Sequence, residues 1–321
     1  MNLESTFADV NDVRLHYVSV GEGPLMLFLH GFPEFWGAWS EQLVEFGKDH
    51  QAVALDMRGY NLSSKPQEIA DYAIGELVKD IKELVAHLGH RQMLLVAHDW
   101  GGAVAWSFAN SHPQMLKGLV IINSPHPAVF ARELLENADQ QAASAYMRTF
   151  QKPGVEAMLA ENDYALLLDA VFKAGSEWEI TDEIRRKYLA AWGQPGALTG
   201  GLNYYRASPL YPPASEEDRA RIQGIADLPR EVFSVQVPCL VIWGSTPLRK
   251  HSPHNPHSPH RLHPQHRPWM SAGVGPKAKR NAPECVRRWL TKFRGLVVAK
   301  DKKMHLERDM SELRLCLRVR L

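Results

Sequence analysis

Residues 97–102, with the sequence AHDWGG, place a carboxylate between an apolar run and a helical pattern. The run at 92–96 is of strand type, and the helical pattern begins at Gly101 and Gly102. Small residues two positions before and after Asp99 allow the sharp strand-to-helix turn that lifts a nucleophile clear of a sheet. A carboxylate there attacks an sp3 carbon and forms an alkyl ester that water must later cleave. Asp99 is therefore the first candidate nucleophile, and its alternative role is a helix N-cap.

A second segment, HGFPE at residues 30–34, directly follows another apolar run. A loop at this place can direct the backbone N–H of Phe32 toward the turn at Asp99, and Pro33 would fix the loop. The backbone N–H groups of Phe32 and Trp100 would together form a two-donor oxyanion hole for the tetrahedral intermediate of ester hydrolysis. The alternative is an ordinary Gly-Pro turn. His30, Gly31 and Pro33, together with Gly101 and Gly102, are the supporting residues of the two segments.

The elements that must position these groups are predicted strands and helices, which alternate along the sequence. One helical pattern covers 74–88, where apolar residues recur at helical spacing. The alternation predicts a mainly parallel sheet that is covered by helices on both faces. The predicted strands are 13–20, 25–30, 51–55, 93–97, 118–122 and, much later, 239–243.

Between 129 and 230 the strand signals stop, and helical stretches at 129–137, 154–172 and 182–192 replace them. An all-helical insertion between two strands is interpreted as a lid over the strand ends, where ligands bind in such sheets. The expected organisation is a core over 1–128, a helical lid over 129–230, a return strand within 231–244 and a basic His/Pro-rich tail over 245–321.

Charge is divided unevenly along the 321 residues. Residues 1–244 contain 19 Lys and Arg against 31 Asp and Glu, whereas 245–321 contain 18 against 5. No apolar run approaches the roughly 20 residues of a membrane span, and residues 1–10 lack a secretory pattern. We therefore expect a cytoplasmic protein with no membrane partner. Three cysteines without metal-ligand spacing predict neither a disulfide framework nor a zinc site.

The tail opens on a His/Pro/Ser tract at 251–266, where six histidines recur at every third position. No packed core is expected there, and such tracts bind nickel or zinc loosely by their density of imidazole. A non-catalytic protein that acts through this basic tail, on nucleic acid or metal, is one alternative function. Deletion of 245–321 would distinguish it, although no specific nucleic-acid partner is expected.

Four motifs occur in order within residues 1–244: HGFPE at 30–34, DMRGYNLSSKP at 56–66, HDWGG at 98–102 and NSPHP at 123–127. In these motifs and their order the chain resembles the epoxide hydrolase family of α/β-hydrolases. The resemblance implies the α/β-hydrolase fold and hydrolysis of an epoxide to a vicinal diol through an ester on Asp99, without cofactor or metal.

Two segments of the expected lid resemble the tyrosine motifs of that family. They are YMRTFQKPGV at 146–155 and LNYYR at 202–206, and they match Tyr146 and Tyr205 to the tyrosines that hydrogen-bond the epoxide oxygen. A phenol suits this task because its O–H can donate at neutral pH. Tyr204 is expected to pack. Structural roles are expected for His98, His126, Asp56 and Arg58.

The second half-reaction requires a histidine that deprotonates water and an acid that orients it. In the resembled family the acid follows the strand that is here 238–244, but residues 245–250 read STPLRK. The triad acid and the triad histidine therefore remain unassigned, and the last strand and helix of the sheet are expected to be missing. A shift of reading frame near codon 245 is our hypothesis for the change. A chain of this kind is expected to stop at a trapped alkyl ester.

The enzymatic alternative is a haloalkane or haloacid dehalogenase with the same nucleophile, in which Trp100 would help to hold a halide. Phe32, where haloalkane dehalogenases tend to carry Asn, and the two tyrosines disfavour it. The expected partner is thus a small-molecule epoxide or, in the alternative, an alkyl halide; the sequence leaves the oligomeric state open.

Overall fold

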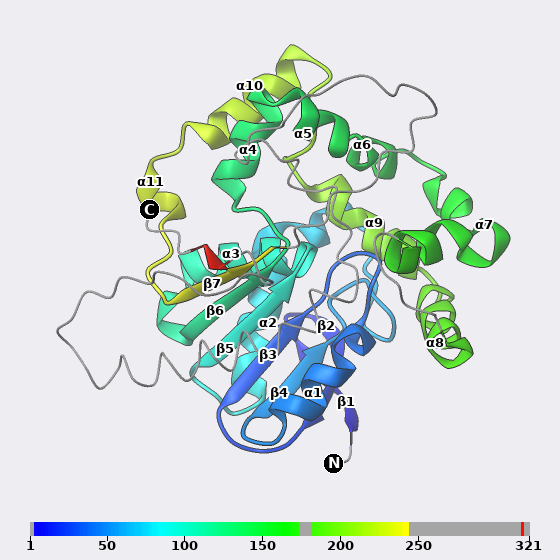
Figure 1. Ribbon diagram of the computed structural model, residues 1–321, viewed down its shortest axis with the longest axis vertical. Helices are drawn as coiled ribbons and strands as arrows, with labels where there is room; N and C mark the ends of the chain where they lie inside the picture. The colour runs from blue at the N-terminus through cyan, green and yellow to red at the C-terminus, as the bar shows by residue number, and fades with distance from the viewer. Residues whose placement is uncertain (1–2, 174–180, 244–315, 318–321) are drawn as a thin grey trace, which may run out of the picture.

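An eight-stranded sheet forms the centre of the computed structural model, which describes residues 3–173, 181–243 and 316–317. The strand order is β1-β2-β4-β3-β5-β6-β7-β8 (Figure 1). Neighbours from β4 to β7 pair in parallel, whereas β1, β2 and β8 pair antiparallel. The strands are β1 (Glu4–Val10), β2 (Val13–Val20), β3 (Leu25–Leu29), β4 (Gln51–Leu55), β5 (Met93–His98), β6 (Leu116–Ile122), β7 (Cys239–Ile242) and β8 (Cys316–Leu317).

Helices cover both faces of this sheet, as the uninterrupted apolar strands predict. All five side chains of β3 are buried. Leu25, Leu27 and Leu29 pack in one apolar cluster with α2 (Ile74–His87) and α3 (Trp100–Ser111). The alternate residues, Met26 and Phe28, pack in a second cluster with α1 (Ser40–Phe46). The alternation of side chains along β3 therefore places one apolar layer on each side of the sheet.

Helices are the only regular elements in the described residues between β6 and β7, and Figure 1 shows these helices gathered on one side of the sheet. Two apolar clusters hold them together, one around Leu159, Trp192 and Leu202 and the other around Leu134 and Tyr205. The α-helices of this segment are α4 (Pro127–Glu136), α5 (Ala138–Ala143), α6 (Tyr146–Phe150), α7 (Val155–Leu168), α8 (Asp182–Trp192), α9 (Ala197–Ala207), α10 (Glu216–Ala226) and α11 (Arg230–Phe233).

Three features differ from the pattern that the sequence predicts. The edge strand β1 is not among the predicted strands, because most of its side chains are exposed and polar. The expected helix over 154–172 is broken at Asn162, Asp163 and Tyr164, which all have positive φ, and it continues as a π-helix over Asp169–Lys173. Asn and Asp tolerate the left-handed region better than most residues. In the expected tail, β8 pairs antiparallel with β7.

A buried ion pair joins the loop after β4 to helix α2. Arg58 donates from Nε and Nη2 to the two carboxylate oxygens of Asp80 at 2.8 and 2.6 Å, and both side chains are under 5% exposed. Replacing Arg58 with Met leaves a buried carboxylate without its partner, which should lower the free energy of unfolding by about 3–5 kcal/mol. Urea unfolding measures the loss. The exposed pair Lys79–Glu76 is the control, since Lys79→Met should cost less than about 1 kcal/mol.

The carboxylate of Asp218 on α10 accepts hydrogen bonds from the Ala214 N–H, the Tyr211 hydroxyl and two arginines. The Ala214 N–H is the largest of the influences that lower its pKa below the ordinary value. A carboxyl whose pKa is lowered by folding stabilises the fold above its unfolded pKa of about 3.9, and this contribution is lost as the pH falls. Between pH 6 and 3 the melting temperature of Asp218→Asn should therefore fall less than that of the wild type; parallel curves would contradict this.

Candidate active site

Asp99 lies in the sharp turn between β5 and α3. Its backbone has φ 51° and ψ −120°, a conformation that is unfavourable for a residue with a Cβ and is held by the surrounding structure. The Asp99 side chain makes no capping hydrogen bond to α3. The alternative role as a helix N-cap is therefore wrong. The backbone of the turn has a partner of its own, because the Ser124 hydroxyl, from the loop after β6, donates to the Asp99 carbonyl oxygen at 2.8 Å.

The loop after β3 reaches the Asp99 carboxylate. The backbone N–H of Phe32 donates to Oδ1 at 2.9 Å, and the peptide bond from Phe32 to Pro33 is cis. Among the described residues, this N–H is the one hydrogen-bond donor to the carboxylate. A Cβ at Gly31 would collide with the carboxylate, so glycine is required for the close approach. The structure thus brings the two predicted segments together.

Further hydrogen bonds hold this loop in place. The two ring nitrogens of His30 have different partners: Nδ1–H donates to the Gly31 oxygen at 2.9 Å, and Nε2 accepts from the Met57 N–H at 3.1 Å. This pairing assigns the neutral imidazole with its proton on Nδ1. The Trp192 indole donates to the Pro33 oxygen, and the Gly101 N–H donates to the His30 oxygen at 2.9 Å. His30 is therefore a support of the loop, whereas Trp192 is a contributor that the sequence patterns did not indicate.

The two expected tyrosines meet although they come from different helices. Tyr146 begins α6 and Tyr205 lies in the last turns of α9, and their ring centroids are 6.0 Å apart at an angle of 77°. Burial raises the pKa of Tyr146, the Asp99 charge raises it further, and a hydrogen bond with Tyr205 partly offsets the two. Burial is also the main cause that raises the pKa of Tyr205, followed by Tyr146 and Asp99. Both phenols are therefore neutral O–H donors near pH 7.

Aromatic rings surround this pair. Tyr205 lies edge-on to Trp100, Phe32 and Phe150, with centroid distances of 5.1, 5.6 and 5.0 Å. A hydrogen bond from the Trp100 side chain to Tyr205 opposes the upward shift of the Tyr205 pKa. These rings, with a small number of hydroxyl groups, form an aromatic wall around Tyr205, a composition typical of small-molecule sites. Phe150, which lies in the quoted tyrosine motif, is an additional wall residue.

Tyr204 packs in the core, as expected, and its ring also contacts Trp100 edge-on at a centroid distance of 5.7 Å. Its hydroxyl donates to the Arg58 oxygen at 2.8 Å, and its ring contacts Tyr60 and Tyr72. The remaining residues given structural roles also have partners elsewhere. His98 bonds to Glu34 at 3.1 Å, and His126 donates to the Phe233 oxygen. The Asp56 carboxylate binds His16, the Trp36 N–H and Asn61.

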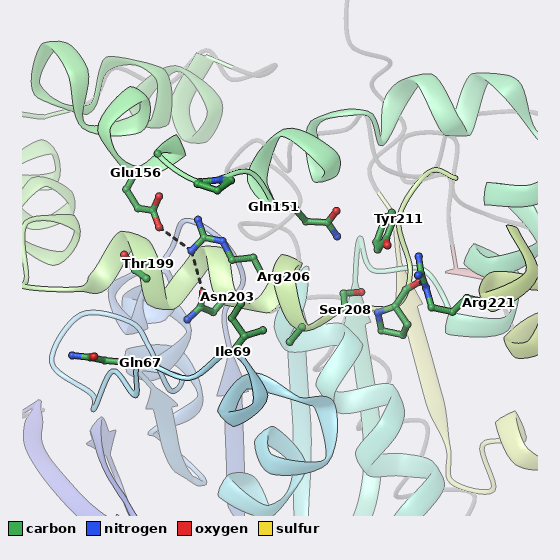
Figure 2. A pocket seen from close by; sticks show the side chains of 14 residues that line it. Gln67, Ile69, Gln151, Glu156, Thr199, Asn203, Arg206, Ser208, Tyr211 and Arg221 are labelled. Carbon is green, nitrogen blue, oxygen red and sulfur yellow. Dashed lines mark hydrogen bonds and ion pairs between the residues drawn. The ribbon is translucent and has the colours of Figure 1, made fainter. Parts of the chain in front are cut away.

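An open pocket of about 870 Å³ lies on another face of α9 (Figure 2). The lining includes Gln151, Glu156, Asn203 and Arg206, but neither Asp99 nor the two tyrosines. Its Arg206 pairs with Glu156 at 2.8 Å and donates to Asn203 Oδ1 at 3.1 Å. This pocket is thus separate from the candidate nucleophile, although its lining residues are sequence neighbours of Tyr205.

The positions expected for a triad acid and histidine follow Gly244 and lie outside the described residues. Within the described residues, no group of three or more His, Cys, Asp or Glu side chains is placed to hold a metal ion. The helices in these residues include none that is long and apolar enough to cross a membrane.

A family model described as the alpha/beta hydrolase fold matches residues 24–165. Epoxide hydrolase 1 of Caenorhabditis elegans is 37% identical over 254 residues, which are 75% of this chain and 58% of that protein. Epoxide hydrolase 4 of Mus musculus is 37% identical over 72% of this chain and 62% of its own length. The chain thus spans about three fifths of these relatives. The AB hydrolase superfamily protein YfhM of Bacillus subtilis is 42% identical over 63% of this chain and 72% of its own length.

Solved structures of epoxide hydrolases are also similar to this chain. A Bacillus megaterium epoxide hydrolase in complex with an inhibitor aligns with a TM-score of 0.71 and 33% identity, and the alignment covers 90% of this chain and all of that one. The epoxide hydrolase VrEH1 from Vigna radiata aligns with a TM-score of 0.60 and 31% identity, over 75% of this chain and 79% of that one.

Proposed function

Because this chain belongs to the α/β-hydrolase fold family and, within it, to the epoxide hydrolases, we propose that it opens small epoxides through a covalent ester on Asp99. The observation that supports this most directly is the Asp99 carboxylate, which projects from a strained turn and is held at Oδ1 by the Phe32 N–H. Its charge acts on both Tyr205, which is buried, and Tyr146, which is half-buried. Residues 129–230, which carry those tyrosines, would form the lid.

In the first step, the Asp99 oxygen that is free of the Phe32 N–H forms a bond to an epoxide carbon. The bond between that carbon and the epoxide oxygen breaks, and its electron pair stays on the oxygen. Tyr146 and Tyr205 donate hydrogen bonds to this oxygen, and one of them transfers its proton to it. Such donors act strongly in a site with little water, because they are oriented before the charge develops.

In the second step, water attacks the ester carbonyl carbon of Asp99. The oxyanion that forms would be held by the N–H groups of Phe32 and Trp100, and collapse of the intermediate would release the diol and restore the carboxylate. This step requires a base that takes one proton from water and passes it to the leaving diol oxygen, and the second proton of that water returns to the tyrosine that was deprotonated in the first step. The residues proposed as nucleophile, oxyanion donors and tyrosines all lie in the described part of the chain, whereas no residue is assigned as the base, so we propose that the ester forms readily and that its hydrolysis is slow.

Intact mass measurement tests the proposal. The purified full chain is incubated with styrene oxide, and the protein should gain the mass of one epoxide, with the adduct on the peptide that contains Asp99. A chain that gains no adduct and forms no diol would contradict the proposed activity on small epoxides. Sustained diol formation without an accumulated adduct would instead support the proposed activity and overturn the slow second step.

The dehalogenase alternative uses the same carboxylate but requires donors for a halide. The Trp100 ring, which would help to hold a halide, packs edge-on against Tyr205 at a centroid distance of 5.1 Å, and this disfavours that alternative. Halide release from a small haloalkane, measured beside the epoxide reaction, distinguishes the two. A function of the basic tail falls on residues outside the described part of the chain, and deletion of 245–321 tests it.

A further inference from the structure

We propose that Gln151 and Arg206 are positioning residues that fix Tyr146 and Tyr205 relative to each other. This inference rests on the proposed function, because it assigns the two side chains a role in stabilising the developing alkoxide. Tyr146 and Tyr205 lie on α6 and α9, which are far apart in sequence. Their hydroxyls can act on one oxygen atom only if side chains hold the two helices in register.

Gln151 connects the end of α6 to the backbone of Tyr205. It directly follows Phe150, the last residue of α6, and its Nε2 donates to the Tyr205 carbonyl oxygen at 3.0 Å. Tyr205 lies within the last four residues of α9, where carbonyl groups have no partner inside the helix. Gln151 therefore satisfies a carbonyl that would otherwise need water, and it does so at the residue that carries the tyrosine hydroxyl.

Arg206 makes the reverse connection. It follows Tyr205 in α9, and its Nη2 donates to the Lys152 carbonyl oxygen at 3.3 Å. Its Nη1 pairs with Glu156 at 2.8 Å and donates to Asn203 Oδ1 at 3.1 Å. The turn after α6 and the last turn of α9 are thus bound from both sides. We call Gln151 and Arg206 together the tyrosine clamp.

The clamp lies outside the apolar clusters. Gln151 and Arg206 both line the open pocket of about 870 Å³, and Figure 2 shows the Arg206 side chain between Glu156 and Asn203. Replacing Gln151 with Met preserves its length and removes its donor, so it creates no cavity in the core. We therefore expect the variant to fold and to lose the orientation of Tyr205.

The kinetic test uses the full chain and styrene oxide, with the rate of Asp99 alkylation measured by intact mass at several epoxide concentrations. In Gln151→Met the limiting rate constant should fall by about 10- to 100-fold, and the half-saturating concentration should change less than about 2-fold, because orientation rather than binding is lost. Gln194→Met is the matched control. Its Nε2 donates to the Ala190 oxygen at 3.2 Å, away from the tyrosines, and its rate should equal that of the wild type.

A conservative variant supplies a rescue. Gln151→Glu lacks the donor at pH 7 but regains an O–H donor when its carboxyl is protonated, near pH 4.3 for an ordinary glutamate. Its rate relative to that of the wild type at the same pH should therefore rise as the pH falls from 7 toward 4. The relative rate of Gln151→Met should stay constant. Equal pH profiles for the two variants would overturn the clamp.

A second measurement does not depend on activity. In protein labelled with 3-fluorotyrosine, the ¹⁹F resonance of Tyr205 is assigned by its loss in Tyr205→Phe. The clamp predicts that Gln151→Met and Arg206→Met each shift or broaden this resonance, while Gln194→Met leaves it unchanged. An unchanged Tyr205 resonance in both clamp variants overturns the inference. A wild-type chain that reacts with no epoxide, but whose Tyr205 resonance responds, overturns the proposed function and leaves the clamp as a structural result.

Discussion

Replacing Asp99 with Asn should abolish alkylation of the protein by epoxides. The amide has nearly the shape of the carboxylate and can still accept the Phe32 N–H, so the turn should be kept. An amide oxygen is a far weaker nucleophile, and removal of a nucleophile can reduce the rate by about 10⁶-fold. The measurement is the mass of the intact protein after incubation with styrene oxide, followed by peptide mapping.

Asp139→Asn is the control for this experiment, because Asp139 is an exposed carboxylate at the start of α5. It should gain one epoxide at the rate of the wild type. An Asp99→Asn protein that gains the same adduct at an unchanged rate would show that another side chain is the nucleophile. The proposed mechanism would then be wrong.

Tyr146→Phe and Tyr205→Phe should each lower the limiting rate of alkylation by about 10²- to 10³-fold, the usual cost of removing one donor from a developing oxyanion. Because both hydroxyls are expected to serve one oxygen atom, the double variant should be slower than either single variant. The half-saturating epoxide concentration should change little, since the aromatic walls remain. Single-turnover kinetics by intact mass give both quantities.

Tyr204→Phe is the matched control for the tyrosines, since it removes the hydroxyl of the adjacent residue. The Tyr204 hydroxyl donates to the Arg58 oxygen, so its loss should reduce stability by about 1–3 kcal/mol. It should leave the rate of alkylation unchanged. A rate loss in Tyr204→Phe that equals the loss in Tyr205→Phe would contradict the assignment of roles within LNYYR.

Elements with a strong local signal could be predicted from the sequence alone. The strand at 13–20 and the helix at 182–192 match β2 and α8 residue for residue. Helix α8 also has a threonine N-cap, whose hydroxyl accepts from the Ile184 N–H, and two acidic residues in its first turn. By contrast, β1 has few buried side chains, so its sequence shows no alternation of apolar residues that would predict a strand. Helix α7 is broken where Asn and Asp take positive φ, and this break does not interrupt the helical spacing of its apolar residues.

Some contacts of the candidate site could likewise be predicted from the sequence, and others could not. The contact between Phe32 and Asp99 follows from two short segments at the ends of neighbouring strands, so strand order and turn chemistry suffice to predict it. The meeting of Tyr146 and Tyr205 was expected from the family resemblance, because no periodic pattern relates residues so far apart. The bonds from Trp192 to Pro33 and from Gln151 to Tyr205 join side chains to distant backbone atoms and have no signal in the sequence.

The placement of the helices between β6 and β7 has a consequence for the order in which the protein is made. Leu119 of β6 pairs with Cys239 of β7, and every tyrosine of the proposed site is encoded between them. At a synthesis rate of about 5–20 residues per second, Tyr205 leaves the ribosome roughly 5–20 s after Asp99. During that interval the carboxylate can already occupy its turn beside Phe32 and Trp100, while Tyr146, Phe150 and Tyr205 have not yet left the ribosome. A nascent chain would therefore expose the proposed nucleophile before the side chains that are proposed to select its substrate are present.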